Sequence, residues 1–114
     1  MPSFVTVSGR DSTYPARAPG WERYLDAARD VRIYRVDGRI KAIQVLAAKN
    51  RVVADSFMQT ALREVAGSGE YKLISSERKG GFTIQRNSAG PQTKLTVYRM
   101  QPSNKISAFI VHFE

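Results

Sequence analysis

Cysteine is absent from the 114 residues, and histidine occurs only once, as His112. Disulfide frameworks, thiolate nucleophiles and zinc–thiolate clusters are therefore excluded. One histidine cannot build a multi-histidine metal site, and no G-x-S-x-G elbow or other nucleophile context accompanies it. We therefore expect no metal, no cofactor and no catalytic residue, and we interpret His112 as structural. An enzyme is not the expected class.

Long apolar runs are also missing. No stretch approaches the roughly 20 apolar residues that span a membrane. The first thirty residues carry four arginines with no apolar segment between them, so they do not resemble a secretory signal. We expect no membrane span and a cytoplasmic location, although a chain trimmed of a leader would look the same.

Acidic residues are scarce. Ten Asp and Glu stand against 18 Lys and Arg, which gives a net charge of +8 and a sequence pI near 10.2. A field of this sign favours polyanionic partners such as nucleic acid or an acidic protein. Because 42% of the residues are apolar, the chain has enough material for a core, and 114 residues indicate one domain, 1–114.

The local patterns predict an α+β domain. Asp37-Gly38 supplies the positive φ angles of a two-residue type I′ hairpin between strands 31–36 and 39–46. Apolar residues recur at helical spacing in two segments, 21–29 and 51–65, and Gly67 suits the end of the second helix. Residues 4–7 are expected to form a short strand, and residues 8–20 a loop or mobile arm.

After Gly69 the pattern becomes β-rich. Strands are predicted at 71–77, 82–86, 93–100 and 105–113, with Gly and Pro between them. The predicted fold class is α+β, an antiparallel sheet made of the early hairpin and a C-terminal four-strand meander, packed against two helices.

Positive charge concentrates in the predicted meander. Seven Lys and Arg stand against Glu77 alone between residues 72 and 113, a net charge of +6 out of the chain's +8. A sheet that interleaves cations with aromatic rings can follow phosphates while bases stack on the rings. Equally, strand aromatics are commonly core residues. The expected nucleic-acid contacts here are Arg78, Lys79, Arg86, Lys94 and Arg99, with Phe82 and Tyr98 as stacking partners.

The first hairpin is the second basic element. Within residues 31–46 its cations meet only one acid, Asp37, and a basic hairpin can dock on phosphates. Alternatively, they are solvated charges that discourage edge aggregation. The residues concerned are Arg32, Arg35, Arg39 and Lys41.

Strand 105–113 has apolar residues on both alternating faces. Such a strand lies either in the centre of a sheet or at an interface. At an edge it would offer a contact for a homodimer or for another chain.

Three functions remain open. The first is a non-enzymatic nucleic-acid-binding domain with a basic sheet surface. The second is a protein-interaction module, an assembly subunit or a small inhibitor, that uses an exposed strand or a basic face to bind an acidic protein. The third is a small basic toxin-like ribonuclease, which composition permits but no residue spacing supports.

Overall fold

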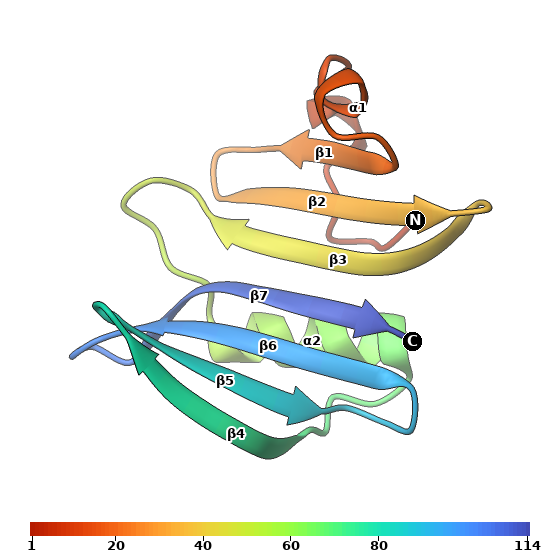
Figure 1. The fold of residues 1–114 in the computed structure, drawn as a ribbon. Helices are drawn as coiled ribbons and strands as arrows, with labels where there is room; N and C mark the ends of the chain where they lie inside the picture. Colours follow the sequence, from red (N-terminus) through yellow and green to blue (C-terminus); the bar gives the residue numbers. More distant parts are fainter.

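Seven antiparallel strands form a single sheet in the order β1-β2-β3-β7-β6-β5-β4 (Figure 1). A computed structural model describes all 114 residues. The elements along the chain are η1 (Val7–Gly9), α1 (Tyr14–Arg17), β1 (Trp21–Leu25), β2 (Arg29–Val36), β3 (Arg39–Ala47), α2 (Asp55–Ala66), β4 (Lys72–Lys79), β5 (Phe82–Ser88), β6 (Thr93–Met100) and β7 (Lys105–Phe113). The α+β fold class predicted from the sequence is confirmed.

The β2–β3 hairpin forms as predicted. Asp37 and Gly38 both adopt positive φ angles, 53° and 77°, as a type I′ turn requires. A β-bulge between Tyr34 and Arg35 shifts the register next to this turn. The four-strand meander is likewise confirmed as β4 to β7.

β7 is an interior strand. It pairs with β3 on one side and with β6 on the other. The expectation that strand 105–113 could mediate a homodimer is therefore wrong, because the backbone groups on both edges of that strand are already used within the sheet. Of its apolar residues, Ile106, Phe109 and Val111 are buried in the core, whereas Ala108 and Ile110 are only half-buried.

The core lies between the sheet and α2. Alternate residues of the central strands point towards the helix, and Met58, Ala61 and Leu62 of α2 pack onto them. Gly67 ends α2 in the left-handed conformation at φ 83°, as predicted. The helix begins later than predicted, because Val53 instead forms an isolated β-bridge with Ile106.

The other predicted helix, 21–29, is wrong. Residues 21–25 form β1, whose Tyr24 pairs with Val31 of β2. The Asp26 carboxylate accepts the backbone N–H groups of Ala28 and Arg29 and so stabilises the turn into β2. Pairing with the β2 edge satisfies more backbone groups than a short isolated helix would, so it prevails over the helical spacing.

The N-terminal residues also differ from expectation. Residues 4–7 form no strand; Val5 is buried in the core and Phe4 packs edge-on against Phe57, with ring centroids 5.8 Å apart. The following segment, 8–20, lies along the outer edge of β1. Arg10 bridges Tyr24, and the Asp11 N–H donates to the Arg23 carbonyl at 2.8 Å. These contacts hold segment 8–20 on the sheet.

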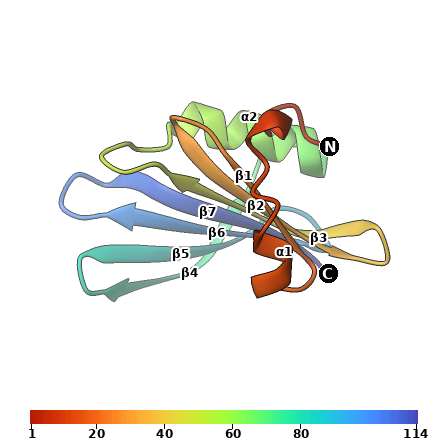
Figure 2. The same cartoon turned by 90° about the horizontal axis from the view of Figure 1, so that it is seen from above.

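Seen from above, α2 covers one side of the sheet (Figure 2). We call the opposite side the open face. α1 lies on the open face beside β1 and β2, whereas β5, β6 and β7 have no element over them there (Figure 2). No helix has both the length and the apolar composition that crossing a membrane requires.

Candidate functional site

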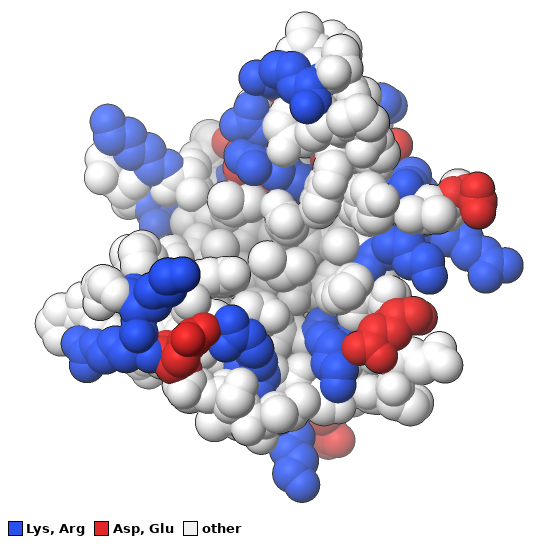
Figure 3. All heavy atoms as spheres, viewed as in Figure 1, with Lys and Arg blue, Asp and Glu red and all other residues white.

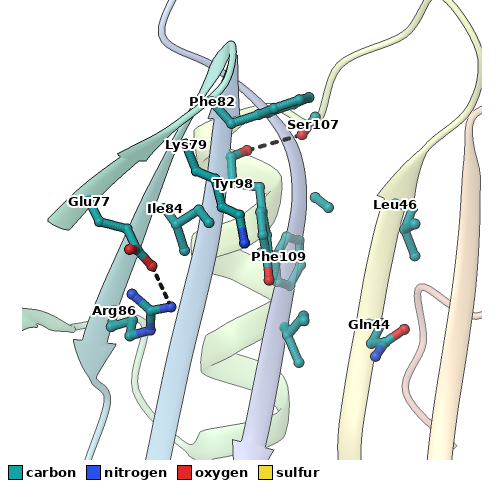
Figure 4. A pocket seen from close by; sticks show the side chains of 12 residues that line it. Gln44, Leu46, Glu77, Lys79, Phe82, Ile84, Arg86, Tyr98, Ser107 and Phe109 are labelled. Carbon is teal, nitrogen blue, oxygen red and sulfur yellow. Dashed lines mark hydrogen bonds and ion pairs between the residues drawn. The ribbon is translucent and has the colours of Figure 1, made fainter. Parts of the chain in front are cut away.

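The open face carries a hollow of about 620 Å³ over β3, β7, β6 and β5 (Figure 4). Gln44, Leu46, Ala108 and Ile110 contribute to its floor from β3 and β7. The β4–β5 hairpin forms its wall with Lys79 and Phe82. The hollow is therefore lined by residues from both halves of the chain.

Strand register explains which side chains meet in the hollow. Directly paired residues share a face of the sheet, and successive residues alternate between faces. Leu95 and Val97 of β6 are buried in the core beneath α2. Lys94, Thr96 and Tyr98 must therefore point to the open face.

Five predicted contacts become neighbours on this face. Lys79 is directly opposite Phe82. Phe82 pairs with Met100, and Arg86 pairs with Thr96, so Tyr98 is a diagonal neighbour of both Phe82 and Arg86. Diagonal neighbours lie about 7–8 Å apart. Lys94 is the second diagonal neighbour of Arg86, and we call this series the open-face track: Lys79, Phe82, Tyr98, Arg86 and Lys94.

The two rings of the track have no aromatic partner. Phe82 is 42% exposed, and neither Phe82 nor Tyr98 belongs to the core or stacks on another ring. Figure 4 shows both rings beside the hollow, with Lys79 pointing into it. An aromatic surface left open in this way can accept a flat ligand group.

The cations of the track are only partly neutralised. Arg86 forms an ion pair of 2.8 Å with Glu77, and both side chains are half exposed. Lys79 and Lys94 have no acidic partner. Figure 3 shows the open face, with basic side chains around an uncharged middle.

Two further predicted contacts point away from the track. Arg78 pairs with Thr83, and Thr83 pairs with Arg99, on the side of the sheet that carries α2. Arg99 is only 9% exposed, and its guanidinium donates to Asp55 Oδ2 at 2.9 Å and to Gln85 Oε1 at 2.9 Å. Arg99 therefore links β6 to the start of α2 and is not available to a ligand on the open face.

The predicted contacts of the β2–β3 hairpin also lie on different parts of the sheet. Arg32 lies on the open face, but it donates to Asp30 at 3.0 Å. Arg35 binds Glu22 at 3.2 Å on the α2 side. Arg39 and Lys41 lie beside the β2–β3 turn, at the opposite end of the sheet from the β4–β5 turn (Figure 1). The hairpin does not join the track.

Asp30 is the centre of an ion-pair network at the β1 end. Burial would raise the pKa of its carboxyl, but hydrogen bonds from Arg23 and Arg32 outweigh burial and hold that pKa below its ordinary value. Arg23 also contacts Asp11 at 3.4 Å, and Asp11 binds Arg17 at 3.1 Å. Three positive charges in this network, those of Arg17, Arg23 and Arg32, are thus opposed by Asp11 and Asp30.

The floor residues of the hollow were not predicted as site residues. The two-sided apolar pattern of residues 105–113 was the available signal, because Ala108 and Ile110 face the open side. Gln44 and Leu46 reach the hollow only because β3 pairs with β7. This pairing joins residues more than 60 positions apart, and no local sequence pattern predicts it.

Comparison with known proteins gives no family. The sequence matches no protein-family model and no curated protein. Among solved structures, the fold is similar to part of a cysteine-rich secretory protein from Staphylococcus aureus, with a TM-score of 0.44 and 10% identity. The match covers 84% of this chain and 37% of that protein.

Proposed function

We propose that the open face binds single-stranded nucleic acid without catalysing a reaction on it. The observation that carries the proposal is the open-face track, in which Phe82 and Tyr98 lie side by side between Lys79 at one end and Arg86 and Lys94 at the other, on one uncovered surface. Unpartnered rings bind bases by stacking, which stabilises each base by about 1–3 kcal/mol, and the cations bind phosphates. The chain's net charge of +8 adds a long-range attraction.

A single strand fits this surface better than a duplex does. Stacking on Tyr98 requires a base whose face is free, which a paired and stacked duplex does not offer. The major groove of B-DNA admits a helix or a two-stranded ribbon, whereas the track lies on the face of a seven-stranded sheet. Duplex binding would rest on phosphate contacts alone.

Fluorescence anisotropy tests the proposal with labelled single-stranded DNA, single-stranded RNA and duplex DNA of one sequence. We expect a preference for a single strand and an affinity that falls steeply between about 50 and 200 mM salt, because cations release counterions from phosphates. Absent binding, or binding that does not change with salt, would contradict the proposal. The RNA recovered after the assay tests the ribonuclease alternative, which predicts cleavage.

A second candidate is a protein-interaction module. The observation in its favour is β4, whose eight residues are all exposed and whose outer edge has no neighbouring strand. Pull-down of an acidic protein that is lost on changing β4, but not on changing the track, would support this candidate instead.

A further inference from the structure

Only one of the two edges of the sheet is covered. Segment 8–20 covers the outer edge of β1 through the Arg10–Tyr24 bridge and the Asp11 N–H. Nothing lies along the outer edge of β4. Unpaired backbone groups on an edge strand are a template for pairing with another strand. β4 also exposes two large apolar side chains, Leu73 by 54% and Ile74 by 60%.

A bulge determines which β4 residues share a face. The register shifts between Leu73 and Ser75, so residues five apart come to the same side of the sheet. Lys72 and Glu77 both belong to the open face, because their partners Ser88 and Ile84 do. Leu73 and Ser76 both point to the α2 side.

This arrangement is self-complementary. When two β4 strands pair antiparallel with Lys72 of one copy opposite Glu77 of the other, Leu73 lies opposite Ser76, and the two residues of each of these pairs share a face. Two-fold symmetry repeats the Lys72–Glu77 pair, and Ile74 of each copy lies next to the axis. Within one chain Glu77 binds Arg86 through Oε1, which leaves Oε2 for the lysine.

Other registers are less favourable. Setting Lys72 opposite Lys79 opposes like charges and also places Ser75 opposite Ser76, which point to different faces. Setting Glu77 opposite Glu77 keeps the faces but opposes two carboxylates. Like charges directly across a sheet are destabilising.

From the free edge and this complementarity, we propose that a second copy of the chain pairs with β4 and extends the sheet across a two-fold axis. The contact is a single pair of edge strands, smaller than the roughly 1,600 Å² of a standard interface. We therefore expect a reversible dimer with a dissociation constant in the micromolar range. The proposal does not depend on nucleic-acid binding, and the open faces of both copies lie on the same side of the extended sheet.

Sedimentation equilibrium tests the dimer without nucleic acid, at about 150 mM salt, where repulsion between the two basic chains is screened. Wild-type protein should self-associate with rising concentration. Glu77→Lys should weaken association roughly tenfold, because two favourable pairs become like-charge pairs. Lys72→Glu combined with Glu77→Lys should restore association. A wild type that stays monomeric, or a folded double variant that stays monomeric, would overturn the proposal.

Cysteine cross-linking tests the register independently, since the chain has no cysteine of its own. Leu73→Cys combined with Ser76→Cys should form a covalent dimer under mild oxidation, because residues 73 and 76 of opposite copies face each other. The matched control is Leu73→Cys combined with Lys79→Cys, whose positions lie on opposite faces, and it should form at least several-fold less dimer. Equal yields, or no cross-link in the first variant, would contradict the register.

Discussion

The β1 and β4 ends of the sheet both carry positively charged side chains, but only at the β1 end are they both paired with acids and covered by another element. At the β1 end, the guanidinium groups of Arg23 and Arg32 share Asp30, and both lie over the ring of Tyr14 from α1. At the β4 end, Lys79 and Lys94 lack acidic partners and no element covers the face. The edge of β1 is covered and that of β4 is free. Positive side chains therefore stay unpaired where the fold brings no acid next to them, as at Lys79 and Lys94.

The largest expected effect comes from breaking the β1 end at Asp30. Its side chain is 14% exposed and lies between two arginines. Asp30→Asn removes the anion that the two half-buried guanidinium groups share and leaves only Asp11 near Arg23, and we expect it to lower the free energy of unfolding by about 2 kcal/mol. Urea denaturation measures this change. Asp37→Asn is the matched control, because Asp37 forms no ion pair and asparagine tolerates its positive φ; it should change stability by less than about 0.5 kcal/mol.

The same substitution has a pH signature. The pKa of Asp30 is lowered below its ordinary value of 3.8 in the folded protein. A carboxyl whose folded pKa is depressed stabilises the fold above the unfolded pKa and loses this effect as pH falls through the folded pKa. The stability difference between wild type and Asp30→Asn should therefore be complete near neutral pH and shrink below pH 3.8. A difference that stays constant into strong acid would rule out the ion pairs as its source.

Detaching the cover of β1 should have the next largest effect. A Cβ atom at Gly9 would lie 1.8 Å from the carbonyl oxygen of Leu25, which is backbone and cannot move aside. We expect Gly9→Ala to push segment 8–20 off β1, to cost about 1.5 kcal/mol of stability and to speed tryptic cleavage at Arg10 and Arg17. Gly81→Ala is the control at the other end of the sheet, where a Cβ meets no atom within 4 Å. Similar cleavage of both variants would show that contact between segment 8–20 and β1 does not protect these sites.

A smaller effect is expected at the aromatic part of the track. Tyr98→Leu keeps an apolar side chain in the hollow but removes the ring on which a base can stack. We expect single-strand affinity to fall by about 1 kcal/mol, or roughly fivefold, with little change in its salt dependence. Tyr71→Leu is the control, because Tyr71 packs against the core. If Tyr71→Leu weakens binding as much as Tyr98→Leu, the loss reflects general stability and not stacking.

The fold was largely predictable because its strongest signals are local. Asp37-Gly38 and the Gly and Pro residues after α2 determine turns through their own backbone preferences. The helix predicted at 21–29 was wrong because the spacing of Trp21 and Leu25 suits a helix or a strand. Pairing with β2 decided between the two structures. Propensity cannot decide such a segment when a strand edge is available nearby.

The candidate site was predictable in part, for the same reason. Alternation along β5 and β6 follows from the sequence once the meander is recognised, and it brings Arg86 and Tyr98 to one face. The separation of Arg78 and Arg99 from the track follows from the same alternation and could have been inferred. The neutralisation of Arg35 could not, because Glu22 reaches Arg35 only across the β1–β2 pair that was predicted as a helix.

The most direct test of the account compares two double variants that each remove two positive charges without breaking an ion pair. Lys79→Ala with Lys94→Ala changes the open face, whereas Arg63→Ala with Arg78→Ala changes the α2 side. The measurement is the slope of log affinity for a single-stranded oligonucleotide against log salt. We predict that the slope becomes shallower by about 1.4 for the first variant, roughly 0.7 per lost phosphate contact on a single strand, and stays close to wild type for the second. Equal changes in both variants would contradict binding on the open face and leave only a nonspecific effect of net charge.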